Sequence, residues 1–361
     1  MKYIDEYRNK NLAKIILKQI DGLSHQPINL MEVCGTHTVA IFRHGLRKVL
    51  PPHIQLISGP GCPVCVTPIR YIDEIIAFAR EKEFIITTFG DMMRVPGSTS
   101  SLEKEKAKGA DIRMVYSTLD ALQVAEDNPF KKIIFVGIGF ETTAPTIASA
   151  ILKAEKEKIK NFFVLSMAKL IPPVLKGLLE SKEININGFL YPGHVSTIIG
   201  SQPYSFIASQ YHIPGVIAGF EPLDILQSIY MLVKQIENNQ AEIAIQYERA
   251  VKPEGNEIAL ARMKKVFNQV DSDWRGIGRI SRSGLEIKED YHPFNARKFA
   301  VEIEETREFE GCRCGEVLRG IINPPQCSLF TKICTPENPR GACMVSSEGT
   351  CAAYYKYGNN I

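Results

Sequence analysis

The sequence predicts an α/β fold with two Rossmann-like domains built on parallel sheets and a third domain that is rich in cysteine. Three observations support this prediction. Short apolar segments alternate with helical segments through the middle of the chain, turns marked by glycine or proline follow the apolar segments, and six of the nine cysteines lie in the last 50 residues. The 361 residues are enough for two or three domains with their own cores.

Seven segments are predicted strands because they are short, rich in β-branched or aromatic residues and mostly free of polar alternation. This pattern is typical of parallel strands covered on both faces. The segments span residues 54–57, 84–88, 112–116, 132–136, 162–165, 189–191 and 216–218. Helical periodicity over 69–81 and 143–156 separates several of them, and 225–270 is mostly helical. This alternation predicts doubly wound α/β units.

Three domains are expected from these segments. The first α/β domain spans 50–125 and the second spans 126–225, with the charged segment 103–111 and the turn at 127–129 near their junction. Residues 1–49 and 226–361 form the third, helical and cysteine-rich domain. Its tail from about residue 271 is rich in glycine, proline and cysteine, so it needs covalent or metal ties to hold a shape.

Composition and charge exclude several classes of protein. The formal net charge of +3, without a long Lys/Arg run, gives no reason to expect a nucleic-acid partner. No apolar run reaches the roughly 20 residues that a membrane helix needs. The first six residues carry acids and lack the core of a signal peptide. We therefore expect a cytoplasmic protein, in which thiols serve metals or redox chemistry more often than structural disulfides.

The pair Cys62 and Cys65 forms a C-x-x-C motif in a turn after a predicted strand, which is a redox or metal-binding arrangement. Thr67 is a plausible N-cap and Pro68 a plausible first residue of the next helix. The two sulfurs would then lie near a helix N-terminus, where the helix dipole favours thiolate. Half of a zinc site is the alternative, but it needs a second cysteine pair nearby.

Cys34 is a third early thiol, and it precedes a predicted helix over 39–50 that Thr36 or Thr38 could cap. His37 could orient this thiol or exchange a proton with it. The alternative is a surface histidine beside a buried thiol.

Turns marked by glycine or proline follow five predicted strands, and polar residues such as Glu141 and His194 lie inside them. Because open parallel sheets bind ligands beyond the carboxyl ends of their strands, we expect these turns to converge on one cleft. The alternative is that the glycines and prolines only turn strand into helix. The five turns are 59–65, 89–91, 137–143, 192–196 and 219–222.

The late cysteines have spacings that fit an iron–sulfur cluster better than a zinc ribbon, which prefers two tight C-x-x-C pairs. Cys327, Cys334, Cys343 and Cys351 are spaced by seven, nine and eight positions, and Cys312 and Cys314 form an additional C-x-C. From spacing alone any four of the six could bind a cluster, which leaves two as a dithiol. Zinc and disulfides stay open as alternatives.

Taken together, these segments resemble the hydrogenase maturation protein HypD family. The resemblance runs from about residue 30 to 355, without a departure at the motif cysteines. It is carried by Cys34-Gly35-Thr36-His37-Thr38, the loop from Gly59 to Cys65, Gly139-Phe140-Glu141-Thr142-Thr143, Pro192-Gly193-His194-Val195-Ser196, and the tail from Cys312-Arg313-Cys314-Gly315 through Cys351.

The resemblance implies a scaffold, rather than an ordinary turnover enzyme, on which the Fe(CN)2CO group of nickel–iron hydrogenases is built. The implied partners are HypC and HypE, and the chain alone is expected to be a monomer. By position, Cys34 looks like the iron-site thiolate, and Cys62 and Cys65 look like a neighbouring redox or iron-site pair. From the residues themselves we expect Glu141 and His194 to line the cleft as hydrogen-bond or proton partners. A [4Fe–4S] cluster is implied at Cys327, Cys334, Cys343 and Cys351.

Two other functions use the same residues. A cluster-linked protein-disulfide reductase of the ferredoxin–thioredoxin reductase type would need the same cysteines but would carry no iron–cyanide group. A zinc-stabilised binding module would be colourless. No Walker-type loop is present, so the sequence gives no sign of nucleotide hydrolysis.

Overall fold

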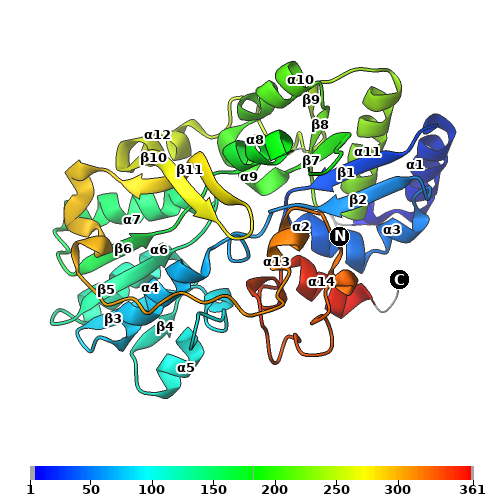
Figure 1. Ribbon diagram of the computed structural model, residues 1–361. Coiled ribbons are helices and arrows are strands. Elements are labelled where there is room, and N and C mark those ends of the chain that lie inside the picture. The colour runs from blue at the N-terminus through cyan, green and yellow to red at the C-terminus, as the bar shows by residue number, and fades with distance from the viewer. Residues whose placement is uncertain (1–4, 182, 359–361) are drawn as a thin grey trace.

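A computed structural model describes residues 5–181 and 183–358, so the first four residues of the predicted non-secretory N-terminus lie outside the description. It contains two separate parallel sheets and one antiparallel hairpin (Figure 1). The predicted α/β fold with parallel sheets is confirmed. The strands are β1 (Ile28–Glu32), β2 (Ile54–Ser58), β3 (Phe84–Thr88), β4 (Ile112–Met114), β5 (Lys132–Gly137), β6 (Phe162–Ser166), β7 (Gly188–Pro192), β8 (Gly215–Ala218), β9 (Ile243–Ile245), β10 (Phe267–Trp274) and β11 (Gly278–Ile287).

All seven predicted strands are present, as β2 to β8. The helices predicted over 69–81 and 143–156 are also present, as α4 and α7. The α-helices are α1 (Lys10–Leu23), α2 (Gly35–Arg43), α3 (Leu46–Val49), α4 (Ile69–Arg80), α5 (Leu102–Ala107), α6 (Thr118–Asp127), α7 (Ala144–Glu157), α8 (Ile171–Ser181), α9 (Gly193–Ile199), α10 (Ser205–Tyr211), α11 (Pro222–Glu237), α12 (Glu257–Val266), α13 (Cys314–Leu318) and α14 (Thr350–Tyr357).

The strands group differently from the predicted residue ranges. The five-stranded sheet has the order β2-β1-β7-β8-β9, and the four-stranded sheet has the order β4-β3-β5-β6. The range 50–125 therefore holds strands of both sheets, and so does 126–225. The chain begins the first sheet, builds the whole second sheet, and then returns to complete the first. Spacing along the sequence cannot reveal this return, because every connection has ordinary βαβ length.

The N-terminal segment also differs from its expected place in the cysteine-rich domain. β1 lies inside the five-stranded sheet, paired in parallel with β2 on one side and β7 on the other. Its residues Ile28, Leu30 and Met31 are fully buried, whereas α2 packs against α14 of the tail. The strand was missed because Asn29 and Glu32 interrupt its apolar pattern.

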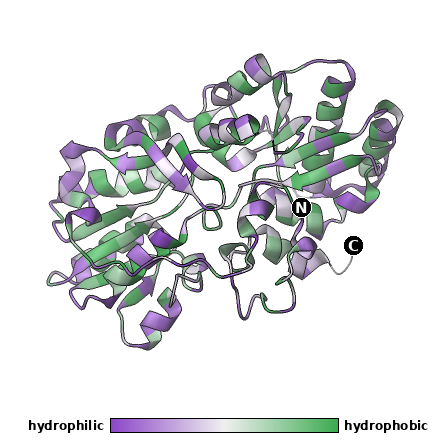
Figure 2. Cartoon of the chain, viewed as in Figure 1, coloured by the Kyte–Doolittle hydropathy of each residue, from purple (hydrophilic) through white to green (hydrophobic). Residues whose placement is uncertain are grey.

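Helices cover both sheets, as expected for parallel sheets. α1 and α11 pack on the five-stranded sheet, and α6 and α7 on the four-stranded sheet. Hydrophobic colour follows the strands of both sheets, whereas hydrophilic colour collects on outer helices and loops (Figure 2). A third apolar core contains side chains of both sheets, the Cys62–Cys65 loop and the cysteine-rich tail, so these parts share one buried region.

The hairpin of β10 and β11 lies in the range that was expected to be mostly helix and loop. Its polar residues and its two-stranded build give a weak pattern in the sequence. The base of the hairpin is held against the four-stranded sheet, since the Ser166 hydroxyl donates to the Leu285 carbonyl at 2.6 Å and the Leu285 N–H donates to Ala168. The helix predicted over 39–50 is also divided, because Gly45 adopts a left-handed conformation between α2 and α3.

None of the helices within the described ranges combines the length and the apolar character that crossing a lipid bilayer requires.

Candidate functional site

Cys34 lies directly after β1 and is itself the N-cap residue of α2, so this helix begins four residues earlier than predicted. The side chains of Thr36 and Thr38 form no cap hydrogen bond, which corrects that expectation. Burial, assisted by the charge of Glu348, raises the pKa of the Cys34 thiol to about 12, although the N–H groups of Thr36 and His37 oppose the shift. The thiol is therefore protonated at neutral pH.

The Cys62–Cys65 loop follows β2 and packs directly on Cys34. The Gly35 N–H donates to the Gly61 carbonyl at 3.2 Å, and a Cβ on Gly61 would lie 2.3 Å from the Cys34 nitrogen. Only glycine permits this approach of the two backbones. Cys62 and Cys65 are joined by a disulfide with a Cα–Cα distance of 5.3 Å, and both are buried. The three early cysteines thus form one cluster.

The predicted cap of α4 is wrong by one residue. Pro68 is the N-cap and Ile69 is the first helical residue. The Thr67 hydroxyl donates instead to the Pro63 carbonyl at 2.8 Å, inside the cysteine loop. This hydrogen bond therefore stabilises the cysteine loop and does not cap the helix.

A cavity of about 430 Å³ opens beside Cys34 at the carboxyl ends of the strands. Turn residues after β1, β2, β5 and β7 line it, as does Glu348 of the tail. The prediction of converging turns is confirmed for 59–65, 137–143 and 192–196. Within the described residues, the turns after β3 and β8 do not line the cavity. The turn after β8 stacks Phe220 on the lining residue His194, and the turn after β3 reaches Ser346, two residues before Glu348. The lining residues are Val33, Cys34, Thr36, Gly61, Pro63, Phe140, Thr142, Thr143, Pro192, His194, Val195, Thr197, Ile198 and Glu348.

His37 and His194 both stack on Phe220, with ring centroids 4.8 and 3.8 Å from that ring. His37 is fully buried, and its Nε2 lies 3.0 Å from the Gly219 carbonyl and 3.2 Å from the Ala218 carbonyl. Burial lowers the pKa of His37 to about 4. The ring is therefore neutral and donates from Nε2, so its hydrogen bonds tie α2 to the end of β8. His194 is the histidine that lines the cavity.

Glu141 lies next to the cavity but does not line it. Its Oε1 accepts the Ile171 N–H at 2.9 Å, at the first residue of α8, and burial raises the pKa of the carboxyl to about 7. Its Oε2 is buried and has no hydrogen-bond partner among the described residues. The carboxyl therefore holds α8 against the turn that lines the cavity.

Sequence reasoning missed Glu348, which carries the tail to the Cys34 site. The Thr36 hydroxyl donates to its Oε1 at 2.6 Å, and a Cβ on Gly35 would lie 2.5 Å from the Glu348 Cβ. The neighbouring Ser346 hydroxyl donates to Asp91, in the turn after β3. Burial raises the pKa of Glu348. Nothing in the local sequence separates this glutamate from an exposed one.

The late cysteines gather around a second, small cavity of about 20 Å³. Five of the six line it, covered by apolar side chains such as Phe330 and Met344. Of the four predicted cluster ligands, three are in this lining and Cys343 is not. The five cysteines are Cys312, Cys314, Cys327, Cys334 and Cys351.

Cys343 is fully buried behind this cavity, and the thiols of Cys314 and Cys351 are hydrogen-bonded to it, which lowers its pKa. Its neighbour Ala342 presents a carbonyl 3.9 Å from the Cys65 sulfur. The early and late cysteine groups therefore meet, with a single residue between the disulfide and Cys343.

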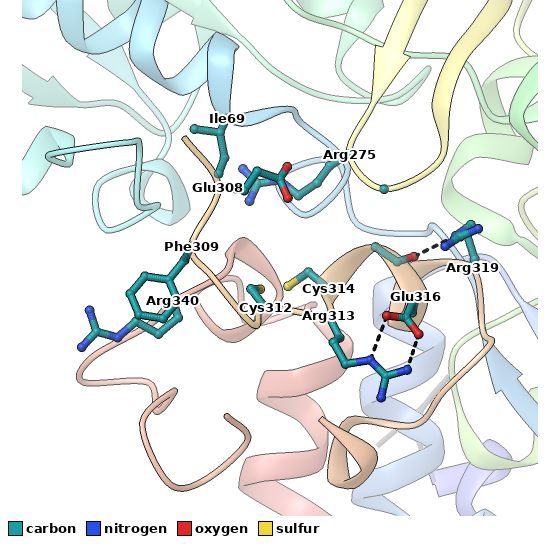
Figure 3. Close-up of a pocket in the computed structure, with 12 residues that line it drawn as sticks. Ile69, Arg275, Glu308, Phe309, Cys312, Arg313, Cys314, Glu316, Arg319 and Arg340 are labelled. Carbon is teal, nitrogen blue, oxygen red and sulfur yellow. Dashed lines mark hydrogen bonds and ion pairs between the residues drawn. The ribbon is translucent and has the colours of Figure 1, made fainter. Parts of the chain in front are cut away.

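A shallow pocket of about 140 Å³ opens on the other side of Cys312 and Cys314 (Figure 3). Four arginines line it. Arg313 pairs with Glu316, whereas the buried Arg275 comes from the β10–β11 turn. Soft thiolates in this number, inside an apolar shell, suit an iron–sulfur cluster. Among the residues that the structure describes, no three His, Cys, Asp or Glu side chains are arranged to hold a single metal ion.

The HypD family model, described as the hydrogenase formation hypA family, matches residues 10–358 of this chain. Two relatives named Hydrogenase maturation factor HypD come from Rhodobacter capsulatus and Escherichia coli (strain K12). They are 48% and 44% identical to this chain, and each alignment covers 99% of this chain and 98% of the relative. A third, from Rhizobium leguminosarum bv. viciae, is 47% identical over 99% of this chain and 96% of its own length. Because the family model and these relatives match nearly the whole chain, this protein belongs to the HypD family of hydrogenase maturation factors.

Proposed function

We propose that this chain is the cytoplasmic scaffold on which the Fe(CN)2CO group of nickel–iron hydrogenase is assembled, together with HypC and HypE. The observation that carries the proposal is the meeting of three sulfur groups: Cys34 beside an open cavity, the Cys62–Cys65 disulfide against it, and the late cysteines behind the disulfide. The chain acts by holding and reducing its cargo rather than as an ordinary turnover enzyme.

Cys34 is the proposed iron-binding thiolate. Iron that carries cyanide and CO is low-valent and suits a soft sulfur donor. The cavity beside Cys34 leaves room for the cargo and for a donor from HypC, and His194 lies at its wall to offer a hydrogen bond to a cyanide nitrogen. Because the free thiol has a raised pKa, iron binding must release its proton.

The Cys62–Cys65 disulfide is the proposed redox partner of the iron site. Opening it takes two electrons and two protons and leaves two thiols, either of which can then bind the cargo iron or reduce it. The packing of the Gly59–Cys65 loop on the Cys34 backbone supports this role.

The late cysteines are the proposed holders of a [4Fe–4S] cluster. Such a cluster, when bound, supplies one-electron transfer, which a low-potential electron carrier of the cell must renew. Cys327, Cys334 and Cys351 would hold it with a fourth cysteine, for which the family resemblance favours Cys343, whereas the cavity lining offers Cys312 and Cys314 equally. Cys343 and Ala342 lie between this cavity and Cys65, so they mark the route toward the disulfide.

Infrared spectroscopy of the chain purified anaerobically with HypC tests this proposal. We expect cyanide and CO bands in the wild type and their loss in Cys34→Ala, because the iron loses its thiolate. Cys327→Ala is expected to lose the visible absorption of the cluster. Cyanide and CO bands at full intensity in Cys34→Ala would contradict the proposed role of Cys34 as the iron-binding thiolate. A wild-type protein with cluster absorption but without infrared bands would instead favour the disulfide-reductase alternative.

A further inference from the structure

We propose that the tip of the β10–β11 hairpin is a clamp that holds the Cys62–Cys65 loop against the late cysteines, and that Arg275 is its positioning residue. This inference rests on the proposed function for the meaning of the two sulfur groups. The clamp itself consists of contacts among residues of this chain. Arg275 lies outside the motifs that carry the family resemblance.

The tip grips the segment that follows the disulfide by two hydrogen bonds. The Arg275 N–H donates to the Val66 carbonyl at 2.8 Å, and its Nε donates to the Thr67 carbonyl at 2.8 Å. Val66 is the residue directly after Cys65. The grip therefore acts one residue from a redox sulfur.

The same tip touches the late cysteines through its backbone. A Cβ on Gly276 would lie 2.0 Å from the Cα of Gly315, so the two glycines are in direct backbone contact. Gly315 is the residue after Cys314, at the start of α13. Gly276 has a φ of +70°, which glycine adopts without strain. The tip thus lies between the residue after Cys65 and the residue after Cys314.

The guanidinium of Arg275 has a donor left over after these contacts. The side chain is 5% exposed, and its Nη2 is buried with no hydrogen-bond partner among the described residues. Arg275 lines the pocket of Figure 3 together with Cys312 and Cys314. A buried cation without an anionic partner is costly, so this charge fits a site whose sulfurs are anionic when a metal group is bound.

The base of the hairpin is fixed to the four-stranded sheet by the hydrogen bonds of Ser166 and Ala168 with Leu285. Trp274, directly before Arg275, donates from its indole to the Ser283 hydroxyl at 2.8 Å, which braces the two strands near the tip. The tip therefore transmits the position of one sheet to both sulfur groups.

The first experiment tests how the charge of Arg275 affects the cluster. It measures the midpoint potential of the cluster in protein reconstituted with iron and sulfide under anaerobic conditions. In Arg275→Met we expect the midpoint potential of the cluster to fall by about 59 mV, a tenfold change in the one-electron equilibrium, because removal of a nearby cation disfavours reduction. Arg275→Lys keeps the charge and is expected to restore the potential. Arg319→Met is the matched control: it also lines the pocket, but it is paired with Glu183. A potential unchanged in Arg275→Met, or lowered equally in Arg319→Met, overturns the role of the charge.

The second experiment tests the grip on protein without a cluster. A neutral phosphine reduces the Cys62–Cys65 disulfide to two thiols and takes up the oxygen of one water, and alkylation with mass spectrometry gives the rate. We expect about tenfold faster reduction in Arg275→Met, from loss of the bond to Thr67, and an unchanged rate in Arg319→Met. Equal rates in all three proteins overturn the clamp. The reduction rate can be measured without a cluster. A wild-type protein that binds no cluster would therefore contradict the proposed function, whereas the clamp would still be tested by the reduction rates of the three proteins.

Discussion

The two cysteine groups of this chain are positioned by different means. Cys34 and the Cys62–Cys65 pair follow β1 and β2, two neighbouring strands of one sheet, and the backbone contact at Gly61 holds them together. The late cysteines lie between residues 312 and 351, where α13 and short turns alternate with loops, and their sulfurs pack on one another. The difference teaches that the early site is shaped by the pairing of two strands, whereas the late site is shaped by loops and short helices whose cysteines pack together.

Removal of single late cysteines gives the largest expected effect. Cys327→Ala, Cys334→Ala and Cys351→Ala should each lose the cluster, because a cluster needs four thiolates. The comparison of Cys312→Ala, Cys314→Ala and Cys343→Ala decides the fourth ligand, and from the family resemblance we expect loss of the cluster in Cys343→Ala. Iron content and visible absorption measure this. Cys34→Ala serves as the control with full cluster content, and its loss of the cluster would show that the two groups are not built independently.

Glu141 gives the next largest effect, on the early region. Its pKa is raised by burial to about 7, so the folded state binds a proton that the unfolded state has lost above about pH 4.5. The stability that Glu141 contributes is fully present below about pH 4.5. As the pH rises from there to about 7, the free energy of unfolding falls by roughly 3 kcal/mol. Glu141→Gln stays neutral and should remove this pH dependence. Urea unfolding of both proteins at pH 5 and pH 7.5 checks the prediction, and identical pH dependence would contradict it.

Gly61→Ala should disturb the early group alone. The added Cβ meets the Cys34 backbone, and overpacking of this kind costs about 2 kcal/mol. We expect lower stability by thermal unfolding and weaker infrared bands, with the cluster absorption retained. Gly22→Ala in α1 is the control, since a Cβ there meets nothing within 4 Å and favours helix. Loss of the cluster in Gly61→Ala would show that the late group depends on the early loop.

Glu348→Gln is expected to have the smallest effect. The charge of Glu348 is one of the causes that raise the pKa of Cys34, so its removal lowers that pKa and increases the thiolate fraction at a fixed pH. Iodoacetamide should therefore alkylate Cys34 several times faster at pH 8. Thr36→Val removes the hydrogen bond to Glu348 but keeps the charge, and an equal acceleration there would assign the effect to opening of the loop instead.

The sequence was a better guide to strands than to their partners. β2 to β8 could be predicted because buried parallel strands form continuous apolar runs. β1 was missed because of Asn29 and Glu32, and the hairpin because β10 carries a polar sequence. The grouping into sheets depends on long-range pairing, which no local pattern encodes.

The candidate site divides in the same way. Cys62, Cys65 and His194 were predicted from turns that follow strands, and Cys34 from its place before a predicted helix. The structure places Cys34 and His194 on one cavity, with the Cys62–Cys65 loop against Cys34. Glu348, Phe220 and Arg275 were missed because each acts through contacts with segments that are distant in the sequence. Arg275 had one indirect signal, a Trp-Arg-Gly turn between two polar strands.

Because the chain returns to its first sheet, the two sheets can be completed only in a certain order. β1 and β2 lack their neighbour until β7 has been made, more than 120 residues after β2. The four-stranded sheet lies wholly between them and can fold first, as a local unit. The pocket beside Cys34 is complete only when Glu348 is added, 160 residues after β7 begins. This pocket therefore takes its final shape late in the assembly of the fold, after the strands of both sheets have been made.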